Sequence, residues 1–308
     1  MRLEELEGLD IEEIAEKIES MEIRGAADIS RAGAHALKKV MEDFEGEDKK
    51  DLLDELEACK IRLLSTRPTA VSLENGLRYV MRGIREVENI GELKEKVREN
   101  YSDFIDNSLK AKDKIAEFGG KRINDEDVVL THCNSSMALA AIKYAWEEED
   151  KNIKVIATES RPKKQGYITA EELSKESIPV TLIVDSAVRS KMNEADKVYV
   201  GADTIASNGA VINKIGTSQV ALCADEARVP LTVCAETYKF SRKTTFGELV
   251  PIEERDASEI VDPEDFPGVN ISNPVFDATP SEYIDSIITE KGVISPEGAY
   301  RIIEEMIR

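Results

Sequence analysis

Five short apolar runs after residue 126 constrain the fold of this 308-residue chain more than any other feature. Segments of helical or loop-like character separate them. Continuous apolar runs that alternate with helices are typical of strands buried on both faces of a parallel sheet. The runs are VVLTH, KVIAT, VTLIV, KVYVG and LTVCA. We therefore expect a doubly wound α/β domain with a parallel sheet over residues 121–308.

The first 120 residues have a different pattern, which predicts helices. Asp10 and Glu13 form a capping-box pattern ahead of apolar residues that share one helical face. Asn89 and Glu92 repeat this start signal, and Pro68 is placed where a helix could begin. We therefore expect a helical amino-terminal domain over residues 1–120.

Composition excludes several classes of function. Hydrophobic residues make up 41% and charged residues 33% of the chain, as in soluble globular proteins. The net charge of −21 argues against an extended nucleic-acid surface, because phosphate binding relies on clustered Lys and Arg. No apolar stretch approaches the ~20 residues that span a bilayer, and the acidic amino-terminal segment is neither a signal nor a transit peptide. We expect a cytoplasmic protein without nucleic-acid or membrane partners.

The cysteines and histidines do not form a familiar metal site. No CxxC pair occurs, and only His35 and His132 could add nitrogen ligands. Reduced thiols in a cytosol are the simplest account, and we expect no metal. Both histidines are interpreted as core residues, and three cysteines as packing residues: Cys59, Cys223 and Cys234.

Chemically informative residues follow the predicted strands. The sequences there are CNSS, ESRP, DSAV, GAD and AETYKF; four contain a carboxylate and the other contains a cysteine. Ligands of doubly wound sheets bind beyond the carboxyl ends of the strands. This edge of the sheet is therefore the candidate site.

Cys133 lies between the strand predicted at 128–132 and a helix that begins near Met137. A helix amino terminus favours the thiolate and binds phosphate. A buried packing cysteine is the alternative, and it is slightly favoured when Cys133 is considered alone. The loop residues that would present backbone amides are Asn134, Ser135 and Ser136.

Two further segments could contribute to the site. Asp203 ends another strand, and it would form an acid/base pair with Cys133 if the two face each other; a turn or cap aspartate is the alternative. Asn213 and Lys214 precede a predicted helix, where lysine and helix-start amides suit a phosphate or a sugar hydroxyl. A surface turn is the alternative for that pair.

Other polar residues are less specific. Arg24 and Arg67 flank predicted helices and could hold phosphate, although most arginines are simply solvated. The loop with Glu159, Arg161, Gln165 and Gly166 could bind sugar hydroxyls or could be a charged surface loop. Asp185 is interpreted, with Ser186, as a helix cap.

The motifs RGA, STRPTAVSL, THCNSS, GADTIASNGAVINKIGT and NPVFDATPSEYIDSIITEKGVI occur in this order between residues 24 and 294. Together they resemble the initiation-factor-2B-like family, which includes methylthioribose-1-phosphate and ribose-1,5-bisphosphate isomerases. The resemblance covers nearly the whole chain. It implies a helical amino-terminal domain followed by a Rossmann-like α/β domain, and homodimers or assemblies of dimers.

The resemblance also implies residue roles. The catalytic cysteine and aspartate of the isomerases map onto Cys133 and Asp203, and regulatory relatives need not retain both, so an enzyme is favoured. Lys239, with Arg242 and Lys243 in CAETYKFSRKT, could neutralise a second phosphate, although regulatory relatives carry a similar segment. The substrate-binding positions that the family motifs imply are Arg24, Gly25, Ala26, Arg67, Asn213 and Lys214.

Within the family, the pattern is most similar to the archaeal ribose-1,5-bisphosphate isomerase branch. Polar Glu74 and Asn75 follow TRPTAV, where methylthioribose-1-phosphate isomerases usually have apolar residues. The resemblance implies conversion of ribose 1,5-bisphosphate to ribulose 1,5-bisphosphate in nucleoside-monophosphate salvage that feeds Rubisco. A methylthioribose-1-phosphate isomerase and a non-catalytic regulatory subunit related to initiation factor 2B are the alternatives.

The implied chemistry is acid/base proton transfer without a cofactor. We expect Asp203 to protonate the ring oxygen, and Cys133 to remove the proton at C2 and return it at C1. Burial would raise the pKa of the carboxyl group and the helix start would lower the pKa of the thiol. A hydride shift is the alternative, and a nucleotide activator and the oligomer size stay open.

Overall fold

The computed structural model describes residues 5–307; the first four residues of the acidic amino-terminal segment and Arg308 lie outside this range. The chain divides into two compact units, Met1–Lys110 and Ala111–Arg308. The division falls inside helix α5 (Ile90–Gly120), whereas the sequence placed the domain boundary at residue 120.

The first unit is helical, as the sequence predicts. The capping box is confirmed, because the Asp10 carboxylate accepts the Glu13 N–H at 2.8 Å and the Glu13 carboxylate accepts the Asp10 N–H at 2.7 Å. Pro68 lies in the turn between two helices and does not start one. The helices of this unit besides α5 are α1 (Ile11–Glu19), α2 (Ala26–Asp43), α3 (Lys49–Thr66) and α4 (Val71–Val80).

The second unit is built on a seven-stranded sheet with the order β10-β9-β7-β4-β1-β2-β3. Neighbouring strands are parallel except for β10, which pairs with β9 antiparallel. The five apolar runs all form strands of this sheet. They are β1 (Val128–Thr131), β2 (Lys154–Thr158), β3 (Val180–Ile183), β4 (Lys197–Val200) and β7 (Leu231–Cys234); the others are β9 (Ser286–Thr289) and β10 (Gly292–Ile294).

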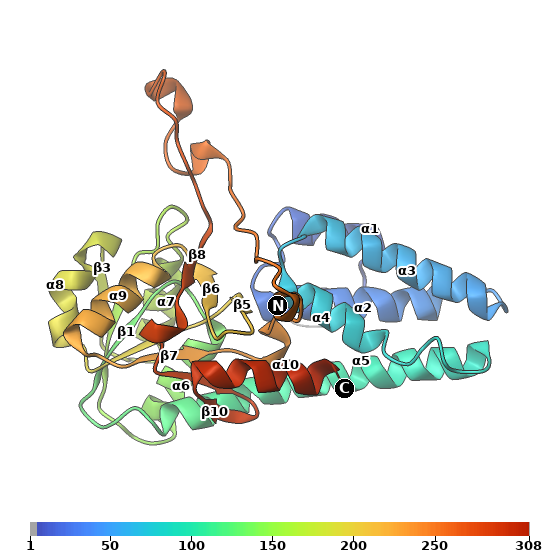
Figure 1. Ribbon diagram of the computed structural model, residues 1–308, viewed down its shortest axis with the longest axis horizontal. Coiled ribbons are helices and arrows are strands. Elements are labelled where there is room, and N and C mark those ends of the chain that lie inside the picture. Colours follow the sequence, from blue (N-terminus) through green and yellow to red (C-terminus); the bar gives the residue numbers. More distant parts are fainter. Residues whose placement is uncertain (1–4, 308) are drawn as a thin grey trace. The chain divides into compact units, whose positions relative to one another are not determined.

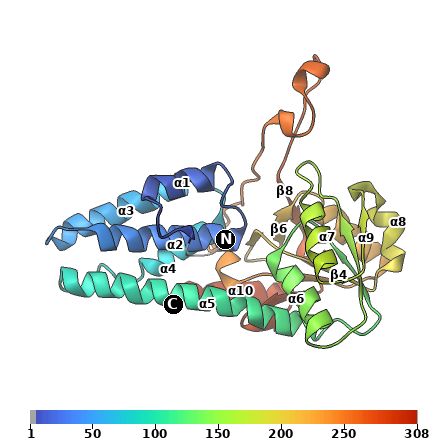
Figure 2. The same cartoon turned by 180° about the vertical axis from the view of Figure 1, so that it is seen from behind.

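Helices cover both faces of this sheet, so the doubly wound α/β class is confirmed. One face packs against α8 (Val188–Lys191), α9 (Thr217–Ala227) and α10 (Ala299–Ile307). The other packs against α6 (Ser136–Glu147) and α7 (Gln165–Lys175), together with the end of α5 (Figures 1 and 2). The expectation of full burial is wrong for the edge strand β3, where Leu182 is 42% exposed because no further strand covers that edge.

Two features of the second unit were not expected from the sequence. A small antiparallel sheet has the order β5-β6-β8. Between β7 and β8 the chain makes a long excursion that stands away from the main sheet (Figure 1), with exposed apolar residues such as Leu249 and Phe266. The strands of the small sheet are β5 (Thr204–Ile205), β6 (Val211–Lys214) and β8 (Phe276–Thr279).

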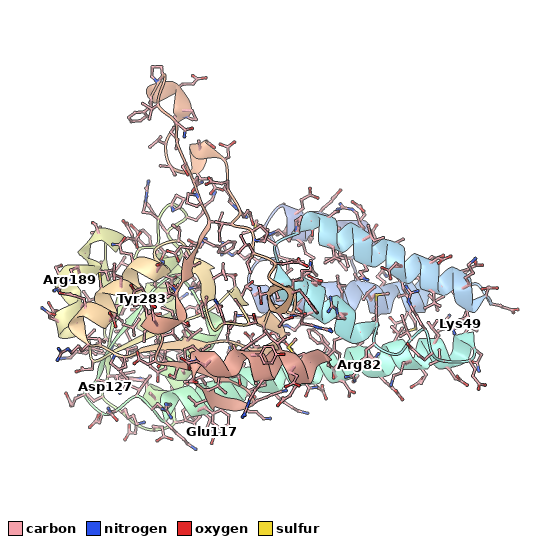
Figure 3. The ribbon with its side chains drawn as sticks, viewed as in Figure 1. Lys49, Arg82, Glu117, Asp127, Arg189 and Tyr283 are labelled. Atoms are coloured by element: carbon pink, nitrogen blue, oxygen red, sulfur yellow. The ribbon has the colours of Figure 1, made fainter. Side chains whose placement is uncertain are left out.

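Two ion pairs of this unit lie away from the carboxyl edge of the sheet. Asp127, directly before β1 and labelled in Figure 3, lies 3.3 Å from the Lys197 Nζ at the start of β4. Arg189 on α8 reaches Glu226 on α9. Among the helices described between residues 5 and 307, none is long and apolar enough to cross a membrane.

Candidate functional site

The order of the strands creates a switch point between β1 and β4. From β1 the chain proceeds outward through β2 and β3, whereas from β4 it proceeds through β7 and β9 in the opposite direction. Doubly wound sheets bind ligands at the carboxyl ends of strands where the order reverses. Cys133 follows β1 and Asp203 follows β4, so the two predicted catalytic residues flank this point.

Cys133 has an unusual backbone conformation. Its φ angle is +67°, in the left-handed region that non-glycine residues rarely adopt. Its N–H donates to the Ser160 Oγ at 2.8 Å, and its carbonyl accepts from the Thr169 Oγ1 at 2.8 Å. The Asn134 N–H donates to the thiol sulfur. Side chains from two other segments therefore hold both backbone polar groups of Cys133.

The thiol is harder to ionise than the sequence suggested. Burial raises the pKa of Cys133 to about 11. The positive charge of Lys214 opposes this rise, and the negative charges of Asp203 and Asp185 add to it. The expectation that the helix start lowers the pKa of this thiol is wrong, because desolvation outweighs the stabilising amide. The charges of Lys214 and Asp203 therefore act on the Cys133 thiol in opposite directions.

The loop after Cys133 starts α6 as predicted. Ser135 is the N-cap, and its Oγ accepts the Ala138 N–H at 3.3 Å. Gly201 makes room for it, because a Cβ at Gly201 would lie 2.3 Å from the Ser135 Oγ. The Asn134 side chain donates to the Thr169 Oγ1 at 3.1 Å, and Ser136 is exposed.

Asp203 and the NK pair are joined through β6. Asp203 is half-buried, and its N–H donates to the Ile212 carbonyl at 2.9 Å. Asn213 is buried, and its Nδ2 donates to the Thr217 Oγ1 at 3.0 Å. Lys214 is half-buried, with its Nζ 5.4 Å from the centre of the Phe276 ring. Both residues of the pair therefore end a strand, and a short turn separates them from α9.

The carboxylate of Asp277, on β8, binds the backbone at the start of α9. Its carboxylate accepts the Gly216 N–H at 2.8 Å and the Ser218 N–H at 3.1 Å, and burial raises its pKa. The expectation that the helix-start amides after Lys214 bind phosphate is therefore wrong for these two amides. No role for Asp277 was predicted from the sequence, although it is the lone carboxylate of the short strand FDAT.

Lys239 is buried beside a carboxylate. Its Nζ lies 2.9 Å from the Glu236 carboxylate, and the two residues are 6% and 0% exposed. The Tyr238 hydroxyl donates to the same carboxylate at 2.8 Å. Burial opposes ionisation of Glu236, yet the Lys239 charge holds the pKa of this carboxyl group below its usual value. Of the neighbouring basic residues, Arg242 is half-buried and Lys243 is exposed.

Four predicted binding residues belong to the helical unit. Arg24 is exposed, Gly25 is the N-cap of α2 with φ +88°, and Ala26 is its first residue. Arg67 directly follows α3 and is half-buried, with its Nη1 in contact with the Met21 sulfur. These residues thus mark the ends of helices, as the sequence predicts.

The segment after β2 supports Cys133 in a way that the sequence did not reveal. Asp185 does not cap a helix with its side chain; its carboxylate accepts the Ser160 and Arg161 N–H groups, both at 2.8 Å. Ser160 itself has φ +57°. Gly166 is needed for close approach, because a Cβ there would lie 1.6 Å from the Thr158 carbonyl oxygen. The only signal was the position of these residues after a strand.

Both histidines lie in the core, as the sequence predicts. His132 and His35 are buried, and the His35 Nδ1 lies 3.3 Å from the Tyr101 hydroxyl. The four cysteines are free thiols. Among them, Cys59 and Cys234 are buried as expected for packing residues, and Cys223 is half-buried.

Comparison with known proteins agrees with this architecture. The pattern of the initiation factor 2 subunit family matches residues 22–296. A ribose 1,5-bisphosphate isomerase from Methanocaldococcus jannaschii is 51% identical over 296 residues, which span 96% of this chain and 94% of that protein. One from Archaeoglobus fulgidus is 54% identical over 299 residues, with coverage of 97% and 94%. A methylthioribose-1-phosphate isomerase from Pelotomaculum thermopropionicum is 38% identical, with coverage of 92% and 82%.

Solved structures share the fold. A translation initiation factor eIF-2B from Pyrococcus horikoshii OT3 superposes with a TM-score of 0.80 at 32% identity, and covers 93% of this chain and 97% of its own. A 5-methylthioribose 1-phosphate isomerase from the same organism superposes with a TM-score of 0.77 at 30% identity, with coverage of 97% and 87%. The expected helical domain followed by a Rossmann-like α/β domain is therefore confirmed.

Proposed function

Because this chain belongs to the initiation factor 2 subunit family, we propose that it is a member of the branch of enzymes that isomerise ribose 1,5-bisphosphate to ribulose 1,5-bisphosphate. The observation that carries an enzymatic role is the placement of Cys133 and Asp203 after the two strands that flank the switch point, where the charge of Asp203 acts on the Cys133 thiol. The chain is 51% and 54% identical to two ribose 1,5-bisphosphate isomerases but 38% identical to a methylthioribose-1-phosphate isomerase. This difference favours the bisphosphate as the substrate.

The reaction needs an acid and a base. Protonation of the ring oxygen breaks its bond to C1, and loss of the proton at C2 forms an enol phosphate between C1 and C2. Loss of the C2 hydroxyl proton and protonation of C1 then give the ketose. The four proton movements cancel, so no cofactor is needed, and positioned proton transfer contributes about 10²–10⁴ in rate.

The raised thiol pKa decides which group starts as the acid. With a pKa of about 11, Cys133 carries its proton at neutral pH. In our proposal Cys133 protonates the ring oxygen, and the Asp203 carboxylate takes the proton from C2. The thiolate next takes the C2 hydroxyl proton, and Asp203 returns its proton to C1. This assignment reverses the roles expected from the sequence and leaves both groups in their starting states.

The phosphate ligands are assigned by charge and position. The positive charge of Lys214 favours release of the Cys133 thiol proton. Lys239 could bind the second phosphate if the anion competes with Glu236 for its ammonium group. The other proposed binding groups are Arg24, Gly25, Ala26, Arg67, Asn134, Ser135, Ser136 and Asn213.

The same proposal sets the biological context. The substrate would arise from nucleoside monophosphates and the product would feed Rubisco. We propose a cytoplasmic homodimer or assembly of dimers, and activation by a nucleotide is testable by adding nucleoside monophosphates to the assay.

Turnover of synthetic ribose 1,5-bisphosphate tests this function. We expect ribulose 1,5-bisphosphate from the wild type, and a loss of at least about 10²-fold in kcat for Cys133→Ser and for Asp203→Asn, because each removes one proton-transfer group. Near-full activity of both variants would contradict the roles. Preferred turnover of methylthioribose 1-phosphate would indicate the other isomerase. Turnover of neither sugar, with stable binding to an initiation factor, would indicate the regulatory alternative.

Deuterium separates proton transfer from a hydride shift in the same assay. In D₂O, deuterium at C1 of the product supports proton transfer through Asp203. Complete retention of the substrate's C2 hydrogen in every turnover would favour the hydride shift.

A further inference from the structure

A chain of buried hydroxyl groups connects His132 to the backbone of Cys133. The His132 Nδ1 lies 2.6 Å from the Thr158 Oγ1, which lies 3.2 Å from the Ser160 Oγ. The Ser160 Oγ accepts the Cys133 N–H. His132, Thr158 and Ser160 are each at most 1% exposed, so their polar side-chain atoms depend on partners within the protein rather than on solvent.

The direction of each hydrogen bond follows from the far end of the chain. The His132 Nε2 lies 2.9 Å from the Ile215 carbonyl oxygen, which can only accept, so this nitrogen carries the proton. Burial lowers the pKa of His132, which keeps the ring neutral and makes its Nδ1 an acceptor. Thr158 must then donate to the ring, and Ser160 donates to Thr158. The Ser160 oxygen is left as an acceptor for the Cys133 N–H.

The Ser160 oxygen accepts a hydrogen bond from Cys133, a residue whose backbone is strained. A non-glycine residue at positive φ is strained and persists only where its surroundings fix it. Both Cys133 and Ser160 have such angles. Asp185 holds the Ser160 N–H, and Thr169 holds the Cys133 carbonyl. Only the hydroxyl chain holds the Cys133 N–H.

We propose that His132, Thr158 and Ser160 form a positioning relay that holds the Cys133 backbone in its left-handed conformation and thereby aims the thiol. The kinetic part of this inference rests on the proposed isomerase function; the conformational part does not. None of the three side chains is required to touch the substrate. They act through Cys133 and are positioning residues.

Matched substitutions of Thr158 test the relay. Thr158→Val keeps the shape of the side chain but removes the hydroxyl group, whereas Thr158→Ser keeps the hydroxyl group. We expect Thr158→Val to lower kcat about 10- to 100-fold with little change in KM, because a misplaced reacting group slows the chemical step. Thr158→Ser should restore most of kcat. Thr232→Val is the control: it removes a buried hydroxyl group on β7 that is hydrogen-bonded to Ser286 on β9, and it should leave kcat unchanged.

Alkylation of Cys133 by iodoacetamide gives a readout that needs no sugar. Its rate is followed by mass spectrometry of the Cys133 peptide, and the buried Cys59 and Cys234 report global unfolding. We expect Thr158→Val and Ser160→Ala to accelerate labelling of Cys133 alone, because the half-buried thiol is released from its fixed position.

Unchanged kcat and labelling in Thr158→Val would overturn the relay. It would also be overturned if Thr158→Ser behaved like Thr158→Val, or if all buried cysteines were labelled together. If the wild type turned over neither sugar, the proposed function would fail, and the labelling pattern would still decide the relay.

Discussion

At the scale of single residues, the Glu236–Lys239 pair shows how burial raises the consequences of one substitution. Neither residue has enough contact with solvent to replace its partner. Removing one member of a buried pair leaves an uncompensated charge, which is strongly destabilising, whereas replacing both by apolar groups is often tolerated. The stability of the fold around Lys239 therefore depends strictly on Glu236.

We expect Glu236→Gln to lower the free energy of unfolding by about 3–5 kcal/mol in chemical denaturation. Glu226→Gln, which breaks an exposed pair with Arg189, should cost at most about 1 kcal/mol. Replacing both partners, with Glu236→Leu and Lys239→Met, should recover most of the loss. A double variant no more stable than Glu236→Gln would contradict this explanation.

The pair also predicts a pH dependence. The pKa of Glu236 is lower in the folded protein than its usual value of 4.5. Its ionisation therefore stabilises the fold fully above about pH 4.5, and this contribution is lost as the pH falls through the folded pKa. The stability difference between the wild type and Glu236→Gln should be constant near neutral pH and should shrink in acid.

At the scale of elements, the sequence predicted the regular parts and missed the connections. The apolar runs identified five strands, because a strand buried in a parallel sheet has a distinctive composition. The same rule placed Cys133 and Asp203 at one edge of the sheet. It could not reveal β5, which has only two residues, or β6 and β8, because VINK and FDAT are not continuous apolar runs.

The site was predictable only where a residue's role depends on its element. Cys133 at a strand end follows from chain order, whereas its raised pKa depends on desolvation by segments far away in sequence. The hydrogen bonds of Thr158, Ser160 and Asp185 likewise join separate strand ends. Such contacts are tertiary, so one sequence carries no local signal for them.

Asp277 is the clearest example of a contact between elements, since it links β8 to the start of α9 through the Gly216 and Ser218 amides. We expect Asp277→Ala to lower the free energy of unfolding by roughly 0.5–2 kcal/mol, as for loss of a helix cap. Asp256→Ala removes an exposed cap bonded to Ser258 and should change stability by less than about 0.5 kcal/mol. Equal effects of the two substitutions in urea denaturation would show that Asp277 is an ordinary surface carboxylate.

At the scale of the whole molecule, the net charge of −21 and the basic residues proposed for the site predict opposite effects of salt on binding of an anionic substrate. Overall charge repels a sugar bisphosphate, so screening would raise kcat/KM. Basic residues in the site attract it, so screening would lower kcat/KM. The Debye length of about 8 Å at physiological ionic strength screens distant carboxylates more than charges next to the ligand. The local basic residues should therefore decide the sign.

We expect kcat/KM for ribose 1,5-bisphosphate to fall as KCl increases from about 0.05 to about 0.5 M, because screening then weakens the attraction to local charges. Lys214→Met should flatten this dependence, since the charge of Lys214 acts on the Cys133 thiol. Lys175→Met changes the net charge equally, but Lys175 is an exposed residue paired with Glu171 on α7, so the slope should match the wild type. A rise of kcat/KM with salt, with equal slopes in both variants, would mean that overall repulsion governs the approach of the substrate.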